Sequence, residues 1–426
     1  MKIKRALHYL NQTYKLGRKL GLDNINQLLD ELGRPDKQMK LIHVAGTNGK
    51  GSTSSMIYTM LQQAGYSVGF YSSPHLVKYN ERFQVDGEMI SDDDLAQTIT
   101  VVKKAVSAMT ARGLTHPTEF EVLTAVSLVY FRDRGCQYAV MEVGLGGRLD
   151  ATNAIVDPVC SVITPIEFDH TSFLGNSLTE IAGEKAGILR KNVPAVIAPQ
   201  QAEAKKEIER VAKQRNTPLI HVKVPKKAIQ SSDLTGTVFL WNDKEFKLRQ
   251  LGRYQVENAI TALTVMDTLR KTGELKITDY RMKQGILHTK WPGRLEKVAN
   301  SPDIYIDGSH NPHGARTLLE TFNQVCKDKR CIAVFGMKDD KDVAGVLKHT
   351  AGLFQHMIAT EPHTEATHSA EEIASLIEPY GVETTIEPDL NKAFDLACSM
   401  ADKDDLIIVY GSFYLIGDIR DRVVKS

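Results

Sequence analysis

The stretch Gly46-Thr47-Asn48-Gly49-Lys50-Gly51-Ser52-Thr53 constrains the fold of this chain more than any other feature. The apolar, β-branched run at 40–45 precedes it and is typical of a buried parallel strand. After it, apolar residues recur at helical spacing up to Ala64 and stop at Gly65, which can cap a helix. A strand, a glycine-rich turn and a helix N-terminus are together what a phosphate-binding loop requires.

This loop departs from the common G-x-x-x-x-G-K-[S/T] pattern at two positions. Val44 stands where the first glycine would be, and Gly51 follows Lys50 where serine or threonine is expected. Lys50 can still supply a positive charge to the phosphates, and the displaced hydroxyls of Ser52 and Thr53 can approach a bound Mg²⁺. The alternative is a glycine-rich turn without nucleotide chemistry, but the flanking strand and helix favour phosphate binding.

The composition narrows the classes of protein to consider. A chain of 426 residues is long enough for two or three domains, and 42% hydrophobic and 25% charged residues are ordinary globular values. With 53 basic and 52 acidic residues, the net charge of +1 gives no electrostatic reason to expect binding to nucleic acid or to an anionic membrane.

The cysteines and the termini indicate a cytoplasmic, soluble protein. The five cysteines are widely spaced, form no C-x-x-C pair and are expected to be buried thiols: Cys136, Cys160, Cys326, Cys331 and Cys398. Charged residues interrupt any apolar core of a signal peptide near Met1, and no run approaches the roughly 20 apolar residues of a membrane span.

Strands alternate with helices along most of the chain. This order predicts an α/β protein with a P-loop and a mostly parallel, doubly wound sheet. Residues 223–250 interrupt the pattern, and within them 237–241 and 245–250 resemble a β-hairpin around Asn242-Asp243-Lys244. Turn residues around 292–303 suggest a domain boundary near residue 298. We therefore expect an ATP-binding domain at 1–297 and a smaller, Rossmann-like α/β domain at 298–426.

Polar residues follow several of the predicted strands, where ligands bind in open α/β sheets. Glu142 ends an apolar strand, which favours Mg²⁺ ligation, although a buried and hydrogen-bonded carboxylate is the alternative. From residue type alone, His170 is better interpreted as a loop histidine and Lys185 as a surface lysine of an amphipathic helix. The cluster at 363–368 is better interpreted as a polar loop than as a metal site.

Several motifs together resemble those of the folylpolyglutamate synthase family of the Mur ligase superfamily, including its bacterial members that are also dihydrofolate synthases. They run in the family order over nearly the whole chain: HVAGTNGKGST (43–53), SSPHL (72–76), YNERF (79–83), MEVGLGGRLDATN (141–153), DH (169–170), GEKAGI (183–188), WPGRLE (291–296), IDGSHNP (306–312) and GSFYL (411–415).

The resemblance implies an ATP-dependent ligase that uses two Mg²⁺ ions. A substrate carboxylate would take the γ-phosphoryl group, and the amine of L-glutamate would displace phosphate from the acyl phosphate. The resemblance also implies the following roles: Ser73, Glu142, His170 and a carbamylated Lys185 as metal ligands; Gly46, Thr47, Asn48, Gly49, Lys50, Gly51, Ser52, Asn258, Arg294, Asp307 and His310 as nucleotide contacts; Lys50, Lys185, His170 and Ser412 in catalysis.

The same resemblance suggests the folate side of the site. His75, Tyr79, Arg82 and Phe83 match a loop that helps hold the pteroate in bifunctional relatives, so dihydropteroate is an expected substrate beside reduced folates. The expected partners are small molecules, and the chain is expected to be a monomer. Three alternatives remain: another Mur-type amino-acid ligase, a P-loop phosphotransferase, and a nucleotide-binding regulatory protein without catalysis.

Overall fold

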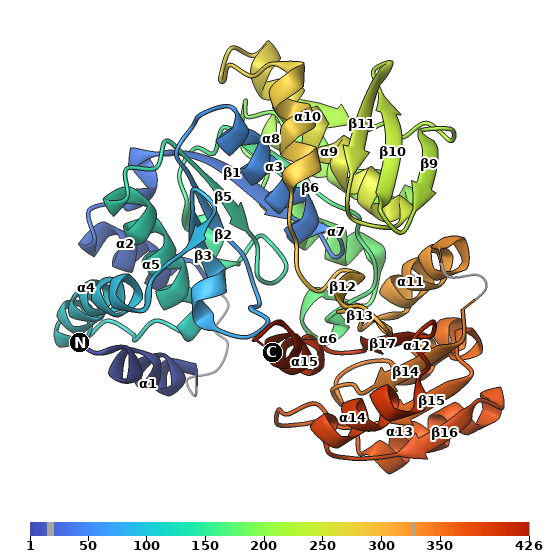
Figure 1. Cartoon of the computed structure of the whole chain (residues 1–426). Helices are drawn as coiled ribbons and strands as arrows, with labels where there is room; N and C mark the ends of the chain where they lie inside the picture. Colours follow the sequence, from blue (N-terminus) through green and yellow to red (C-terminus); the bar gives the residue numbers. More distant parts are fainter. Residues whose placement is uncertain (15–20, 326–328, 426) are drawn as a thin grey trace. The chain divides into compact units, whose positions relative to one another are not determined.

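The computed structural model describes residues 1–14, 21–325 and 329–425 (Figure 1). The chain forms two compact units. Unit 1 comprises Met1–His75, Tyr79–Lys226 and Glu257–Thr289, and unit 2 comprises Leu76–Lys78, Lys227–Val256 and Lys290–Ser426. The boundary that the sequence predicts near residue 298 therefore falls inside unit 2, which also takes the antiparallel strands at 229–248.

Unit 1 is built on an eight-stranded sheet. Six of its strands run parallel, namely β2, β5, β1, β6, β7 and β8, and β3 and β4 add an antiparallel edge beside β2. In spatial order the strands are β4 (Glu88–Met89), β3 (Phe83–Val85), β2 (Val68–Tyr71), β5 (Tyr138–Glu142), β1 (Lys40–Ala45), β6 (Cys160–Ile163), β7 (Ala195–Ile197) and β8 (Leu219–His221).

The helices of unit 1 precede, connect or follow these strands: α1 (Ile3–Tyr14), α2 (Asp23–Glu31), α3 (Lys50–Gln63), α4 (Asp92–Ala111), α5 (Glu119–Asp133), α6 (Thr171–Leu174), α7 (Leu178–Ala186), α8 (Ala202–Arg215), α9 (Arg253–Lys271), whose residues 253–256 fall in unit 2, and α10 (Asp279–His288). Short 3₁₀ turns lie at Pro35–Gln38, Tyr79–Arg82 and Ala151–Ala154. Side-chain caps fix several helix starts. Ser91 accepts from the N–H of Asp94, and Thr118 and Ser177 form capping boxes with Glu121 and Glu180.

Both faces of the parallel sheet are covered. In β1, Leu41 and Ala45 point to one face and Ile42 and Val44 to the other, yet all four are at most 1% exposed. On the first face, Leu41 shares an apolar core with helices α1, α2, α4 and α5, and Ala45 shares one with α7 and α8. On the second face, the complete burial of Ile42 and Val44 shows that this side is covered as well. This arrangement is the doubly wound sheet that the sequence predicts.

Unit 2 holds two sheets. The smaller is antiparallel: β9 (Ile229–Asp233), β10 (Gly236–Trp241) and β11 (Lys244–Leu248), with the expected hairpin between β10 and β11. The larger has the spatial order β12 (Glu296–Ala299), β13 (Asp303–Asp307), β17 (Leu406–Tyr410), β14 (Cys331–Phe335), β15 (His356–Ala359) and β16 (Glu383–Ile386), and only β12 is antiparallel.

The larger sheet of unit 2 also has helices on both faces: α11 (Pro312–Val325), α12 (Val343–Thr350), α13 (Ala370–Ile377), α14 (Leu390–Met400) and α15 (Phe413–Lys425), with 3₁₀ turns at Ala351–Leu353 and Glu378–Tyr380. Alternate residues of β14 separate the two cores. Cys331, Ala333 and Phe335 face α11, α12 and α13, whereas Ile332 and Val334 face α14 and α15.

Some sequence-based predictions need correction or fall outside the described residues. Residues 1–38 contain α1, α2 and a 3₁₀ turn, and residues 15–20 lie outside the described part. Cys136, Cys160, Cys331 and Cys398 are thiols, and Cys398 is only half-buried; Cys326 lies outside the described residues.

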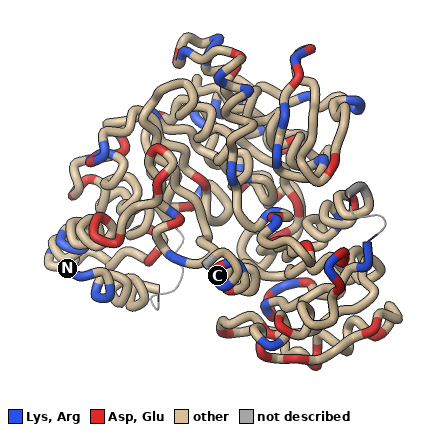
Figure 2. Tube along the Cα trace, viewed as in Figure 1, with Lys and Arg blue, Asp and Glu red and all other residues tan. Residues whose placement is uncertain are grey.

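Acidic and basic residues are interspersed along both units (Figure 2). None of the helices in the described residues is long and apolar enough to cross a membrane.

Candidate active site

Four of the predicted motifs follow four neighbouring parallel strands of unit 1. Strands β2, β5, β1 and β6 are adjacent in the sheet, and they lead into Ser73, Glu142, the phosphate loop and His170, respectively. Parallel strands end at the same edge of a sheet, so these motifs share the carboxyl edge, where ligands bind in such folds. The order of the strands, which the sequence does not reveal, is what brings the motifs together.

The phosphate loop turns sharply between β1 and α3. Gly46 has φ +150°, and a Cβ there would lie 1.8 Å from Oγ1 of Thr164 on the neighbouring strand. The backbone N–H groups of Thr47 and Asn48 both donate to the carbonyl of Pro165, at 2.9 and 3.2 Å. These two N–H groups therefore hold the loop against the segment after β6.

Asn258 of α9 lies against the phosphate loop. Gly49 has φ +81°, and a Cβ at this position would be 2.3 Å from Oδ1 of Asn258. Asn258 is only 5% exposed. The structure thus places one predicted nucleotide residue beside the loop, although about 200 residues of sequence separate the two.

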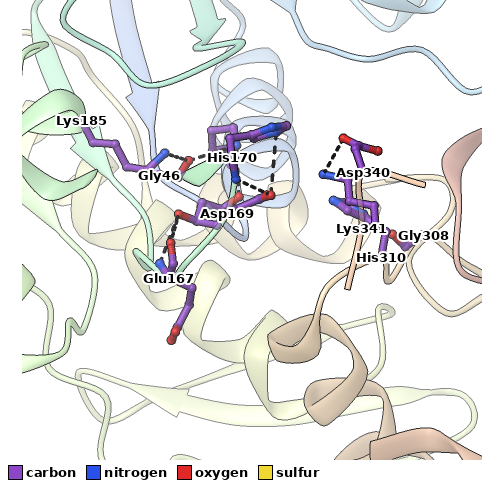
Figure 3. Close-up of polar contacts among 11 residues, drawn as sticks. Gly46, Glu167, Asp169, His170, Lys185, Gly308, His310, Asp340 and Lys341 are labelled. Atoms are coloured by element: carbon purple, nitrogen blue, oxygen red, sulfur yellow. Dashed lines mark hydrogen bonds and ion pairs between the residues drawn. The ribbon is translucent and has the colours of Figure 1, made fainter. Parts of the chain in front are cut away.

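Lys50 and Lys185 converge on one backbone oxygen. Nζ of Lys50, at the start of α3, donates to the carbonyls of Gly46 and Thr47 at 3.0 and 3.1 Å. Nζ of Lys185, near the end of α7, donates to the same Gly46 carbonyl at 2.8 Å (Figure 3). Lys185 is 4% exposed, so its interpretation as a surface lysine is wrong.

The surroundings of Lys185 favour the neutral amine. Burial lowers the pKa of Lys185 from its ordinary value of 10.5 to about 7, and the nearby positive charge of Lys50 acts in the same direction. The carboxylates of Asp169 and Asp150 oppose this change. A neutral lysine is a nucleophile and can react with CO₂, whereas the ammonium form cannot.

The loop after β5 packs directly on the backbone of α7 around Lys185. A Cβ on Gly147 would lie 2.8 Å from the carbonyl oxygen of Glu184 and 3.0 Å from Cα of Lys185. A Cβ on Gly187 would lie 2.3 Å from Cβ of Arg148. The N–H of Arg148 donates to the carbonyl of Glu184 at 2.7 Å. Only glycine at both positions permits this close approach.

A buried hydrogen-bond network connects this loop to β1. Nε2 of His43 lies 2.8 Å from Oγ1 of Thr152, and Thr152 donates to Oδ1 of Asp150 at 2.5 Å. Because the Thr152 hydroxyl donates its proton to Asp150, His43 is the donor to Thr152. Oδ2 of Asp150 accepts from the N–H of Leu145 at 2.9 Å, so the network holds the glycine-rich segment in place.

The predicted metal ligands differ in burial and setting. Glu142 is 4% exposed at the end of β5, whereas the side chain of His170 is 31% exposed. His170 has φ +50° and directly precedes α6, and its N–H donates to Oδ1 of Asp169 at 2.9 Å (Figure 3). Among the described residues, no three histidine, cysteine, aspartate or glutamate side chains group closely enough to hold a metal. A hydroxyl, a carboxylate and an imidazole from adjacent strand ends still suit a Mg²⁺ that retains water ligands.

The residues predicted to contact the pteroate also lie together in unit 1. Nε of Arg82 donates to Nδ1 of His75 at 2.9 Å, and the rings of His75 and Tyr79 are 4.6 Å apart. The hydroxyl of Tyr79 donates to Glu119 at 2.6 Å. Burial, with the Arg82 guanidinium, lowers the pKa of His75 to about 3. Phe83 lies deeper, fully buried beneath Tyr71.

In unit 2, Asp307 organises the turn that contains His310. Asp307 is 2% exposed, and its carboxylate accepts from the N–H of Leu295 at 2.7 Å, from the N–H of Ser309 at 2.8 Å and from the Ser309 hydroxyl. Nδ1 of His310 donates to the carbonyl of Gly308 at 2.8 Å (Figure 3). The guanidinium of Arg294 lies 4.6 Å from the centroid of the Phe413 ring.

Ser412 and the histidine-containing loop of unit 2 have evident structural roles. Ser412 is 4% exposed and its hydroxyl accepts from the N–H of Tyr414 at 3.3 Å, at the start of α15. Nδ1 of His363 lies 2.8 Å from a carboxylate oxygen of Asp418, and His368 pairs with Glu372. The interpretation of the segment around 363–368 as a polar loop agrees with these contacts.

Sequence reasoning gave no role to several residues that shape the site. Asp169 acts electrostatically on Lys185, while His43, Asp150 and Thr152 form the buried network, and Phe413 contacts Arg294. All of them lie inside or beside quoted motifs, so the motifs located them without indicating their contacts.

Two family models match the chain. The Mur ligase middle domain matches residues 44–266, and the glutamate ligase domain of Mur ligases matches residues 293–413. The first range contains the phosphate loop, Lys185 and Asn258, and the second contains Arg294 and the turn after β13.

Individual relatives agree with these models over the full length. The dihydrofolate synthase/folylpolyglutamate synthase of Bacillus subtilis is 33% identical over 98% of both chains. The solved structure of E. coli FolC in complex with DHPP and ADP is 30% identical and covers 99% of this chain and 98% of its own, with a TM-score of 0.87. A bifunctional folylpolyglutamate synthase/dihydrofolate synthase with Mn, AMPPNP and L-glutamate bound is 32% identical, covers 99% and 98%, and has a TM-score of 0.85. This chain therefore belongs to the folylpolyglutamate synthase/dihydrofolate synthase family of the Mur ligase superfamily.

Proposed function

We propose that this protein ligates L-glutamate to reduced folates and folylpolyglutamates, and also to dihydropteroate, with hydrolysis of ATP to ADP and phosphate. The observation that best supports the proposal is the convergence of Lys50 and Lys185 on the Gly46 carbonyl, at the edge where four motifs meet. A phosphoryl group transferred there would meet the Lys50 cation and the N-terminus of α3, which both favour its negative charge.

The chemistry has two steps. A carboxylate oxygen of the folate or dihydropteroate attacks the γ-phosphorus of ATP, so that a P–O bond to ADP breaks and an acyl phosphate forms. The neutral amine of glutamate then attacks the acyl carbon, phosphate leaves, and the amine loses a proton as the amide forms. A bound divalent cation would neutralise charge on the transferring phosphoryl group.

We assign roles to the residues of the chain accordingly. Lys50 binds the phosphates, Asn258 fixes the loop at Gly49 and contacts the nucleotide, and Ser73, Glu142 and His170 would hold the cation. Lys185, once carbamylated, would add an anionic oxygen ligand of the type that Mg²⁺ prefers. Asp307, His310 and Arg294 of unit 2 bind the nucleotide, and Ser412 acts near the glutamate.

The pteroate assignment rests on the arrangement of His75, Tyr79 and Arg82. A neutral His75, whose ring is tilted by 41° against that of Tyr79, offers with it an aromatic surface for a flat heterocycle. Arg82, whose guanidinium lies 5.4 Å from the centroid of the Tyr79 ring, adds a positive charge for a substrate carboxylate.

The proposal is tested by ADP release in the presence of ATP, Mg²⁺ and L-glutamate, with tetrahydrofolate or dihydropteroate as acceptor. Mass spectrometry should find each acceptor extended by glutamate. Glutamate-dependent turnover with tetrahydrofolate alone would limit the activity to polyglutamylation. ADP release without any glutamylated product would instead support a phosphotransferase or a regulatory nucleotide-binding protein.

A further inference from the structure

Arg294, His310 and Phe413 form an aromatic and cationic cluster within unit 2. Cζ of Arg294 lies 4.6 Å from the centroid of the Phe413 ring, and the centroids of the His310 and Phe413 rings are 5.5 Å apart with their planes at 56°. The three residues come from separate segments: the turn before β12, the turn after β13 and the first residue of α15. Phe413 is thus the common neighbour of two predicted nucleotide residues.

We propose that Phe413 is a positioning residue that orients the Arg294 guanidinium and the His310 imidazole for nucleotide binding. This inference rests on the proposed function, because it takes Arg294 and His310 as nucleotide contacts. It adds a residue for which neither the motifs nor the proposed chemistry gives a role.

The contact with Phe413 suits a guanidinium that must bind an anion. A long arginine side chain loses rotamer freedom when it binds a ligand, and prior stacking on a ring reduces this loss. The interaction between a cation and an aromatic face also leaves the N–H groups at the guanidinium edge directed away from the ring, where they can donate to phosphate or ribose oxygens.

The surrounding backbone fixes the cluster. A Cβ on Gly308 would lie 2.5 Å from Nη1 of Arg294 and 2.6 Å from Cε1 of Phe413, so the turn after β13 packs closely on both side chains. The N–H of Gly308 donates to the carbonyl of Gly293 at 2.9 Å, which ties this turn to the residue before Arg294. His310 in turn donates to the carbonyl of Gly308.

Phe413 is anchored on its other side by the core. It packs against the apolar cluster that contains Leu415, Ile416 and Ile419 of the same helix. The ring is therefore half-buried and held by α15, whereas Arg294 belongs to a turn. Because Phe413 packs against the core whereas Arg294 lies in a turn, the ring restricts the positions that the guanidinium can take.

The test uses Phe413→Leu, which keeps apolar volume but removes the aromatic face. Unit 2 offers a matched control in Phe394, whose ring lies 5.4 Å from Cζ of Arg422. Phe394→Leu also removes an arginine–phenylalanine contact, but away from the turn after β13. ADP affinity is measured by calorimetry on the full-length protein, and thermal unfolding reports folding.

We expect Phe413→Leu to weaken ADP binding about fivefold and to raise the KM for ATP similarly, with the KM for glutamate unchanged. Phe413→Tyr should restore wild-type affinity. Phe394→Leu should lower the unfolding temperature about as much as Phe413→Leu does, but it should leave the affinity for ADP unchanged. Equal losses of ADP affinity in Phe413→Leu and Phe394→Leu would mean that only general stability is involved, and would overturn the inference.

An Arg294→Ala background separates this inference from the proposed function. Phe413→Leu should weaken ADP binding less in that background than in the wild type, because only His310 is left for the ring to orient. If Arg294→Ala weakens ADP binding but Phe413→Leu does not, the positioning role fails and the nucleotide assignment stands. If Arg294→Ala binds ADP like the wild type, the nucleotide assignment of Arg294 fails and the inference fails with it.

Discussion

Replacement of Lys185 by arginine or alanine is the most informative perturbation of the candidate site. The Lys185 amine is buried, donates to the Gly46 carbonyl, and lies where burial and Lys50 lower its pKa to about 7. If the amine reacts with CO₂, a new N–C bond forms, one proton leaves, and the side chain ends in a carboxylate instead of a cation. Arginine keeps the positive charge but does not form this carbamate readily.

The lowered pKa determines what fraction of the Lys185 amine is neutral and therefore able to react with CO₂. At pH 8 an amine with a pKa of about 7 is roughly 90% neutral, whereas one at the ordinary 10.5 is about 0.3% neutral. The reactive fraction is therefore about 300-fold larger at Lys185 than at an exposed lysine. As the pH falls below 7, the amine becomes protonated and the carbamate should be lost.

We expect both Lys185→Ala and Lys185→Arg to reduce ligation by about 10²–10³, the usual cost of one charged contact to the reacting groups. Acetate or propionate should partly restore Lys185→Ala by supplying the missing carboxylate. Carbon-13 NMR in labelled bicarbonate should detect a carbamate in the wild type and in the control Lys271→Arg, whose lysine side chain is 74% exposed, but not in Lys185→Arg.

Two results would refute this reasoning. One is ligation at the wild-type rate by a folded Lys185→Arg variant. The other is active wild-type protein that carries no carbamate signal under saturating bicarbonate. Either result would return Lys185 to the role of a buried hydrogen-bond donor to the phosphate loop.

Three further predictions follow from single contacts. Lys50→Ala should lower glutamate-dependent ADP release by about 10²–10³ with an unchanged circular dichroism spectrum, and near-normal turnover would remove the loop from the mechanism. Gly49→Ala should abolish measurable ADP binding because its Cβ meets Asn258 at 2.3 Å; Gly113→Ala, with a similar φ of +80° and nothing within 4 Å, controls for backbone strain alone. Burial lowers the pKa of His43 to about 3, so between about pH 6.5 and 3 the unfolded chain binds more protons than the folded one. The free energy of unfolding should therefore decrease as the pH is lowered through this range. His43→Gln should flatten this dependence in urea titrations, and an unchanged slope would contradict the assignment.

The parts of the fold that depend on local pattern were predictable. Strand β1, the glycine turn and α3 are contiguous, and Ser91 with its following aspartates marks the start of α4 by a local cap. The elements that the sequence did not indicate have only a weak local pattern of apolar residues. Strand β16, for example, is four residues long and lies at the edge of its sheet, so no residue in it is fully buried.

The setting of Lys185 was not predictable from its neighbours in sequence. Its helix places Ile181, Ala182 and Ala186 in the core, and one lysine among alternating polar residues usually points to solvent. Its burial depends on a loop more than thirty residues earlier in the chain, which packs on the same helix. The resemblance to a known family located the residue, but only the tertiary contacts explain its lowered pKa.

The packing of Gly147 on α7 and of Arg148 on Gly187 gives a physical reason for two motifs to occur together. The segment 144–153 is held by the hydrogen bonds that connect His43, Thr152 and Asp150. The same segment packs closely on the backbone of α7 around Lys185. A side chain on either glycine would move that backbone, because the opposing atoms are main chain or Cβ and cannot rotate away. A displacement of about 1 Å at a reacting group can cost on the order of 10²-fold in rate. The close packing of the glycine-rich segment after β5 on α7 therefore fixes the position of Lys185, and with it the distance between the lysine amine and the phosphate loop.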